Sequence, residues 1–282
     1  MSNGLISLRD ALRAFVEAEA TQSQLHIRPL HRHIVERLVI EGGFRPDDMS
    51  PHPPLRIEIV GTGRERRHRL VYDEAAARTG DQTVLGGLKT KDVDVVISHR
   101  HVGPCLAVSV KGTFNAFRNL TNRMEEAAGD CTNLHIAYPA LVYGFLHVMR
   151  ANRAEDVTKS NDIAIQTDGT IVQAIQRYHD AMARITNRAD LRDDVSRYEA
   201  VAIALVHPRG DNIAEVVDDY PLASSPLAFG RFFQKLYQAY DLRFVYSAPA
   251  LEAQTRRLEW DPDSPLLSDA QAMDFVPRLA SD

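Results

Sequence analysis

The pattern of apolar and polar positions divides the chain into helices and strands. Apolar residues three and four positions apart, as in Leu8, Leu12 and Phe15, predict a helix over residues 7–20. The same spacing predicts a second helix over residues 29–41, which begins at a proline and ends at a pair of glycines. Residues 45–54 hold four prolines and two aspartates and are expected to form a loop.

In the next part of the chain, apolar and polar residues alternate every second position, as they do in strands. Residues 55–60 alternate and predict a strand, with 68–72 as its expected partner, and 74–87 are interpreted as a short helix followed by a turn. A β-branched strand over 93–98, a turn at 102–104 and a strand over 106–111 predict a β-hairpin. A helix over 119–133 and a buried strand over 140–149 are expected next.

The remainder predicts a polar loop over 158–169, a helix over 170–185, a strand over 199–206, a helix over 227–240, a final strand over 242–246 and a partly irregular tail from 251. Helices around a central group of strands indicate an α/β fold whose central mixed β-sheet is flanked by helices. We expect a single domain over residues 1–282, with a helical N-terminal part of about 1–50 and a core of about 55–250.

Composition and charge restrict this picture only moderately. The chain is 44% hydrophobic and 25% charged, which is typical of a globular protein, and its net charge of -5 excludes a histone-like polycation. A negative total does not exclude DNA binding, because the field that matters is local to the binding cleft. No run of roughly 18 apolar residues predicts a membrane span, and residues 1–10 do not have the pattern of a secretory signal. With only two cysteines, a reducing bacterial cytoplasm is the expected location.

The predicted hairpin carries the residues most suggestive of chemistry. Asp94 interrupts an apolar strand, and a buried carboxylate is costly unless it is paired or binds a metal. The alternatives are that Asp94 faces solvent or that Asp92, on the same face, has the functional role. Lys111 ends the second strand, so the hairpin would bring it to Asp94. A carboxylate beside an ammonium group, with a second carboxylate nearby, suits metal-assisted phosphodiester hydrolysis.

The second carboxylate is expected on the following helix. Glu125 and Glu126 are adjacent and therefore point about 100° apart, so only one of them can face the hairpin. In the alternative interpretation both are solvated and Glu126 pairs with an arginine. Glu36, on the second predicted helix, is a further candidate acid.

Asp94 followed by Ser109-Val110-Lys111 resembles the PD-(D/E)xK nuclease superfamily, in which an aspartate precedes a Glu/Asp-x-Lys strand. Ser109 stands where that superfamily has its second acid. One branch of its restriction enzymes instead has Ser or Cys at this position and draws a glutamate from beyond the lysine. Thirteen residues separate Lys111 from Glu125, and the resemblance implies that Glu125 is the relocated acid and that Ser109 leaves space for it.

Residues 122–129, Asn-Arg-Met-Glu-Glu-Ala-Ala-Gly, are also similar to a helix in restriction endonucleases that cut XhoI-type sites. The resemblance covers about residues 93–146 and implies a restriction-endonuclease-like core. It also implies a homodimeric type II enzyme that hydrolyses double-stranded DNA with Mg²⁺, leaves 5′-phosphate ends and has a cognate DNA methyltransferase as genetic partner. Asp94, Glu125 and the Val110 carbonyl would then bind Mg²⁺, and Lys111 would orient the attacking water.

The start of the helix over 119–133 is polar and suits contacts with phosphates near a helix N-terminus. The residues concerned are Arg118, Asn119, Thr121, Asn122 and Arg123. The alternative is that Asn119 or Thr121 caps the helix and the arginines are ordinary surface residues. His31 and His33 are two positions apart, a poor spacing for chelation on a helix, so no zinc site is predicted.

Two other functions remain compatible with the same residues. The first is a modification-dependent or repair nuclease of the same fold. The second is a catalytically inactive DNA-binding protein, because the usual second acid is absent from the Ser109-Val110-Lys111 strand.

Overall fold

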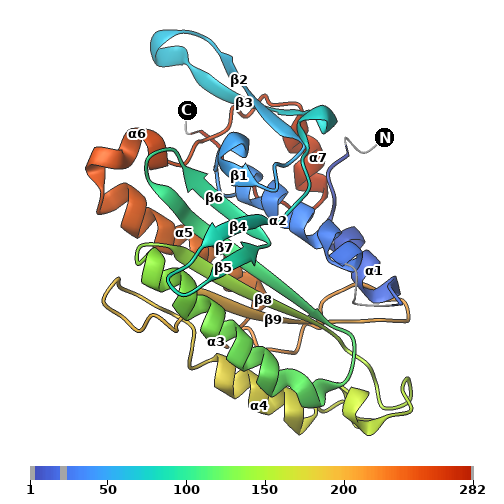
Figure 1. Ribbon diagram of the computed structural model, residues 1–282. Helices are drawn as coiled ribbons and strands as arrows, with labels where there is room; N and C mark the ends of the chain where they lie inside the picture. Colours follow the sequence, from blue (N-terminus) through green and yellow to red (C-terminus); the bar gives the residue numbers. More distant parts are fainter. Residues whose placement is uncertain (1–3, 20–23, 281–282) are drawn as a thin grey trace.

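A five-stranded mixed sheet forms the centre of the computed structural model, which describes residues 4–19 and 24–280 (Figure 1). Its strands in spatial order are β1 (Met49–Ser50), β6 (Val95–His99), β7 (Gly103–Thr113), β8 (Val142–Arg150) and β9 (Ala200–Val206). The pairs β1–β6 and β6–β7 are antiparallel, whereas β7–β8 and β8–β9 are parallel. The predicted α/β class with a central mixed sheet is confirmed.

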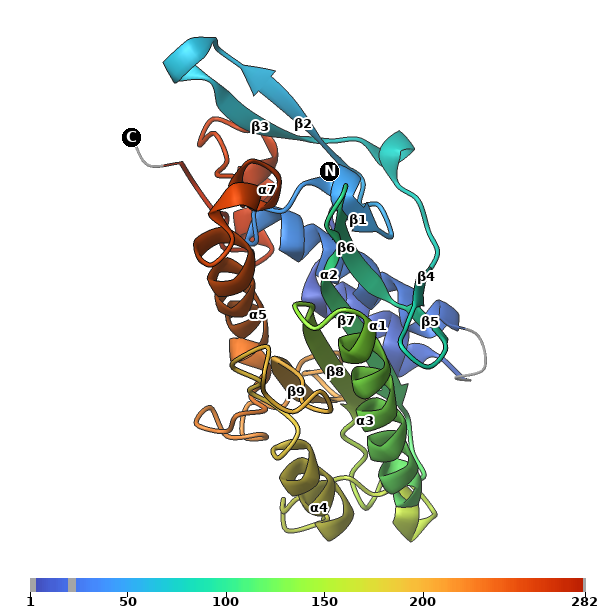
Figure 2. The same ribbon diagram turned by 60° about the vertical axis from the view of Figure 1, so that its left-hand side comes forward.

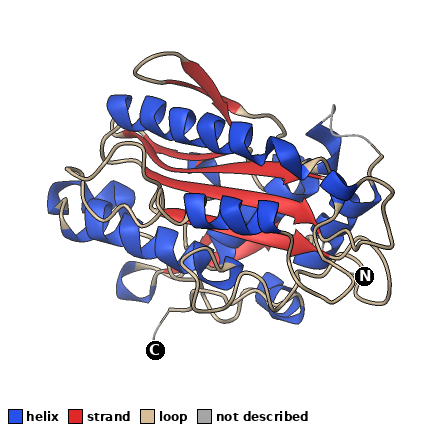
Figure 3. Ribbon diagram, turned by 90° about the horizontal axis from the view of Figure 1, so that it is seen from below, coloured by secondary structure: helices blue, strands red, loops and turns tan. Residues whose placement is uncertain are grey.

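Helices cover both faces of this sheet, as the views in Figures 2 and 3 show. The helices packed on one face are α1 (Leu8–Glu17), α2 (Arg28–Ile40) and α5 (Phe232–Tyr240), and those on the other are α3 (Leu120–Ala137) and α4 (Gln173–Met182). Alternate strand residues enter the two cores. Val95 and Ile97 pack with α1, α2 and α5, and Val96 packs with α3 and α4.

Two small hairpins lie outside the central sheet. The first, β2 (Leu55–Val60) with β3 (Arg67–Tyr72), projects from the rest of the molecule in Figures 1 and 2. The second pairs β4 (Gln82–Leu85) with β5 (Thr90–Val93), and β5 leads directly into β6. Two short helices, α6 (Glu252–Thr255) and α7 (Leu266–Ala272), occur in the C-terminal part. No helix among the described residues combines the length and apolar character needed to cross a membrane.

Most of the predicted elements are present with small shifts of their ends. The first helix ends earlier than predicted, at Glu17, and Ala20 of the predicted range lies outside the described residues. The 55–60 and 68–72 strands pair as predicted, and so do the strands of the central hairpin. The helix expected over 170–185 is the shorter α4, and the helix expected over 227–240 has its α-helical part only from Phe232.

Two predictions were wrong. Residues 242–246 do not form a strand, because Asp241–Tyr246 continue α5 as a π-helix in which Phe244 is buried against Tyr240. A short apolar run cannot distinguish a strand from a buried helix by its period alone. Residues 74–87 are not a helix followed by a turn either. A single 3-10 turn at Glu74–Ala76 precedes β4, whose partner strand β5 lies further along the chain.

Candidate functional site

Asp94 lies at a bend between β5 and β6, where the chain leaves one hairpin and enters the central sheet. The register of β6 with β7 ends at Val95 opposite Val108. Beyond that point the Val110 N–H donates a hydrogen bond of 2.7 Å to Asp94 Oδ2. At this point of β7 the Asp94 carboxylate accepts the backbone hydrogen bond that a neighbouring strand would otherwise accept. This bond fixes the position of the carboxylate and leaves its other oxygen, Oδ1, for a different contact.

Lys111 follows Val110 directly, so the hairpin brings Asp94 and Lys111 to the same end of β7 as predicted. The Lys111 side chain remains 30% exposed, and its Nζ lies 3.9 Å from Glu126 Oε1 on α3. Its ammonium group is thus near the exposed carboxylate of Glu126, and its charge also acts on the buried carboxylate of Asp94. A cation in this place can stabilise negative charge that develops on a phosphate.

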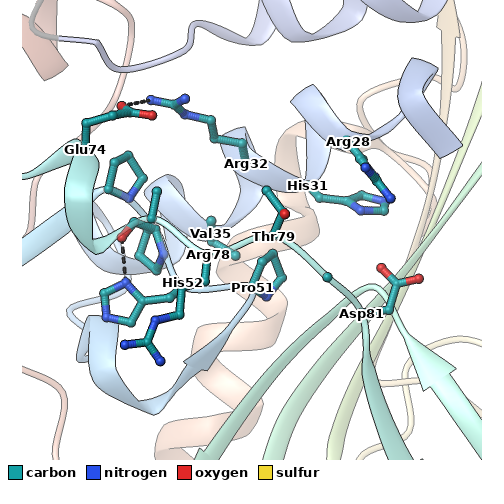
Figure 4. Close-up of a pocket in the computed structure, with 14 residues that line it drawn as sticks. Arg28, His31, Arg32, Val35, Pro51, His52, Glu74, Arg78, Thr79 and Asp81 are labelled. Carbon is teal, nitrogen blue, oxygen red and sulfur yellow. Dashed lines mark hydrogen bonds and ion pairs between the residues drawn. The ribbon is translucent and has the colours of Figure 1, made fainter.

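The second oxygen of Asp94 faces a cluster that joins three separate parts of the chain. His31 Nε2, from α2, lies 3.7 Å from Asp94 Oδ1. One ligand atom each from His31, Asp94 and Asp81 all lie within 4.8 Å of one another. Figure 4 shows the Asp81 carboxylate, from the loop before β4, pointing toward the His31 ring. In the described part of the chain, this is the one group of three such residues close enough to share a metal ion.

Burial gives this cluster unusual electrostatics. The pKa of Asp94 is raised above its ordinary value because burial penalises the carboxylate more than His31, the Val110 N–H and Lys111 stabilise it. Burial also lowers the pKa of His31, although the charge of Asp94 opposes this. At neutral pH the imidazole is therefore uncharged, which is the form that binds metals.

Helix α3 holds the β4–β5 hairpin, and with it the Asp81 loop, in place. The Asn133 side chain accepts hydrogen bonds from the Leu88 and Lys89 N–H groups and donates one to the Lys89 carbonyl. Lys91 Nζ forms an ion pair of 2.6 Å with Asp130 Oδ2. The cluster is thus supported from α2 on one face of the sheet and from α3 on the other.

A cavity of about 120 Å³ opens beside the cluster and includes His31 and Asp81 in its wall. Three arginines, Arg28, Arg32 and Arg78, also line it (Figure 4). Arg32 is paired with Glu36 and Glu74. Arg28 and Arg78 form no salt bridge with any residue that the structure describes, so both are free to meet an anion.

The structure brings Glu126, rather than Glu125, to the predicted lysine. Glu126 is near Lys111 and also accepts a hydrogen bond of 3.0 Å from Arg123. Partial burial would raise its pKa, but Lys111 and Arg123 outweigh burial, and the pKa of Glu126 is lowered. Glu125 is exposed, and it has no ion pair with the described residues.

Three further predicted residues have other surroundings. The Ser109 hydroxyl is buried and hydrogen-bonds with the Tyr143 hydroxyl at 2.8 Å, on the face of the sheet covered by α3. Val110 contributes its N–H to Asp94. The fully buried Glu36 accepts hydrogen bonds from the Ile6 N–H and from Arg32, and burial raises the pKa of its carboxyl to about 7. Its oxygens are therefore occupied away from Asp94.

The predicted phosphate-binding residues all lie on the surface at the start of α3: Arg118, Asn119, Thr121, Asn122 and Arg123. Asn119 occupies the N-cap position, but its side chain makes no capping hydrogen bond. Of the alternative interpretation, capping by Asn119 is therefore not observed, whereas Arg118 and Arg123 do lie on the surface.

Sequence reasoning did not find His31 or Asp81. His31 was considered only with His33, whereas its partners are distant in sequence. The available signal was that His31 lies three and four positions before Ile34 and Val35, on the apolar side of the predicted helix, where a polar ring needs a partner. Asp81 lies in the segment whose strand was not recognised. No model of a known protein family matches this chain, and no curated protein matches it.

Proposed function

We propose that the protein is a divalent-metal-dependent endonuclease that hydrolyses double-stranded DNA, as a type II restriction enzyme does. The observation that carries this proposal is the arrangement at the end of the β6–β7 hairpin. There Asp94 accepts a hydrogen bond from Val110, the residue before Lys111, and faces a histidine and a second aspartate. The sequence resemblance to PD-(D/E)xK nucleases concerns this same hairpin. The restriction-endonuclease-like core, the homodimer, the genetic partner methyltransferase and Mg²⁺ as cofactor are parts of the same proposal.

The residues present fit a metal ion, because a buried imidazole nitrogen without a hydrogen-bond partner faces a carboxylate oxygen. Asp94 and its neighbours in the cluster would hold the ion, which would polarise the phosphate and lower the pKa of bound water. Lys111 then positions the attacking water and stabilises negative charge on the phosphate oxygens. Glu126, whose Oε1 lies 3.9 Å from Lys111 Nζ, would help to orient the Lys111 ammonium group.

The distribution of positive charge supports a phosphate backbone as the substrate. Arg28 and Arg78 line the cavity beside the cluster, and Arg118 and Arg123 are exposed at the start of α3, where Arg123 pairs with Glu126. Arginine suits phosphate contacts because its planar guanidinium can donate two hydrogen bonds at once. These local groups can bind DNA even though the whole chain has a net charge of -5.

Digestion of a sequenced, unmethylated phage genome with Mg²⁺ or Mn²⁺, followed by mapping of the ends, tests the proposal. We expect discrete fragments with 5′-phosphate ends. Asp94→Asn and Lys111→Met should each lower the cleavage rate by about 10³-fold. Asp92→Asn and Lys159→Met are matched controls, because both residues are exposed outside the cluster, and they should cut like the native protein.

The other outcomes identify the competing functions. Cleavage of modified or damaged DNA alone would replace the restriction enzyme by a modification-dependent or repair nuclease. Binding of DNA with no cleavage under either metal would show a catalytically inactive DNA-binding protein. Cleavage by Asp94→Asn at the native rate would contradict the assignment of the active site to the Asp94 cluster.

A further inference from the structure

His31 contributes a nitrogen ligand to a cluster that is otherwise built from carboxylates. The residue is 3% exposed, and Nε2 is a buried atom without a hydrogen-bond partner. A buried polar atom normally has a partner, because leaving it without one costs about 1–3 kcal/mol. Nε2 faces Asp94 Oδ1 at 3.7 Å, which is too long for a hydrogen bond.

That separation is instead the one expected of two ligands of the same ion. With metal–ligand bonds of about 2.1 Å, neighbouring ligands of one ion lie about 3–4 Å apart. Asp81 brings a third ligand atom within 4.8 Å of the other two. The three side chains come from α2, from the loop before β4 and from the bend before β6, so the site exists only in the folded chain.

We propose that His31, Asp81 and Asp94 form a binding site that holds a divalent first-row transition metal ion more tightly than Mg²⁺, which remains the weaker of two ions that support the proposed cleavage. The reason is the ligand set. Mg²⁺ strongly favours oxygen ligands, whereas an imidazole nitrogen suits ions later in the series from Mn²⁺ toward Zn²⁺. The inference deepens the proposed function and rests on it for the ion's role in cleavage, but the binding of the ion is a separate property.

His33 provides a matched control on the same helix. It is also 3% exposed, and its Nε2 is likewise a buried atom without a hydrogen-bond partner. Its ring lies against Phe275, and its Nδ1 hydrogen-bonds with the Ile6 carbonyl, so no carboxylate of the cluster is near it. The two histidines therefore differ in their surroundings but hardly in their burial.

Calorimetric titration of the full chain with MnCl₂, CoCl₂ and MgCl₂ tests the inference without any cleavage assay. We expect one Mn²⁺ or Co²⁺ per chain, bound at least about tenfold more tightly than Mg²⁺. His31→Ala should weaken Mn²⁺ binding by about 10–100-fold and remove most of the preference over Mg²⁺, and His33→Ala should change neither. The visible absorption of bound Co²⁺ should change in His31→Ala alone.

Thermal unfolding without metal shows whether each variant folds. If His31→Ala does not, Asp81→Asn serves instead, because it keeps the size of the side chain and should weaken Mn²⁺ binding to a similar extent. Native affinity for Mn²⁺ in a folded His31→Ala, or binding of Mg²⁺ as tight as that of Mn²⁺, would overturn the inference. DNA cleavage with unchanged Mn²⁺ affinity in His31→Ala would defeat this inference alone. Binding of Mn²⁺ as expected with no cleavage would defeat the proposed function alone.

Discussion

Asp94 and Glu199 are both buried carboxylates that directly precede a strand of the central sheet, and each accepts a hydrogen bond from the neighbouring strand. For Asp94 the donor is the Val110 N–H of β7, and for Glu199 it is the Tyr143 N–H of β8. Beyond this shared contact their surroundings differ. Glu199 also accepts from Arg188 at 3.1 Å and forms an ion pair of 2.6 Å with Arg243.

The pKa values follow from this difference. Burial opposes ionisation of both residues, but His135, Arg243 and the Tyr143 N–H outweigh it at Glu199, whose pKa is lowered. At Asp94 burial prevails and the pKa is raised. The protein thus supplies a complete set of partners for one buried carboxylate and an incomplete set for the other. The first arrangement stabilises the fold, and the second is suited to a ligand that arrives from outside.

The largest contrast is expected in stability. Glu199→Gln should lower the free energy of unfolding by about 3–5 kcal/mol, because it leaves the buried Arg188 and Arg243 without a counter-charge. Asp94→Asn should change it by about 1 kcal/mol or less, since the amide oxygen can still accept from the Val110 N–H. Urea unfolding in metal-free buffer measures both.

In an assay of cleavage rate, the order of the two variants should be the reverse of their order in stability loss. Asp94→Asn remains folded and loses activity, whereas Glu199→Gln, at a temperature where it is folded, cuts at close to the native rate. Equal losses of stability in the two variants would show that Asp94 is a structural residue like Glu199.

The next contrast is between the adjacent acids Glu125 and Glu126. Glu126→Gln should lower the cleavage rate by about 10–100-fold, because it removes the carboxylate that faces Lys111. Glu125→Gln should have little effect, because this side chain is exposed and not paired with a described residue. Initial rates on a plasmid substrate measure the difference. A larger loss of cleavage rate in Glu125→Gln than in Glu126→Gln would favour Glu125 as the relocated acid that the sequence resemblance implies.

How far the sequence could predict the site depended on whether its residues belong to one local pattern. The convergence of Asp94 and Lys111 was predictable, because two strands of alternating pattern joined by a short turn pair as a hairpin. The choice between Glu125 and Glu126 was not, because it depends on how α3 is rotated against the sheet. His31 and Asp81 join Asp94 only through tertiary packing, and no spacing along the chain encodes that.

The same limit applies to the fold. The long amphipathic helices and the central hairpin follow from their periods. The segment after Tyr240 was wrongly predicted as a strand, because whether an apolar run continues a helix depends on what it packs against, here the contact of Phe244 with Tyr240. The pairing of β4 with β5 was missed for a similar reason, since Asn133 of the distant α3 holds the connecting loop.

The smallest expected effect concerns His147, a buried histidine whose two ring nitrogens both have partners, unlike those of His31. It hydrogen-bonds with Thr113 at 2.8 Å and with Tyr178 at 2.7 Å, and burial lowers its pKa from 6.5 to about 3. Between these two pH values the unfolded chain binds a proton that the folded chain does not. The contribution of neutral His147 to the free energy of unfolding is therefore fully present above pH 6.5 and decreases as the pH falls below 6.5.

His147→Gln removes this proton uptake. Between about pH 7.5 and pH 5.5 the native protein should lose about 1 kcal/mol more stability than His147→Gln does. Urea unfolding of both proteins at the two pH values measures the difference, and other titrating groups cancel because they are common to both. If both proteins lost the same stability, His147 would take up a proton in the folded state as readily as in the unfolded state. Its pKa would then not be lowered by burial.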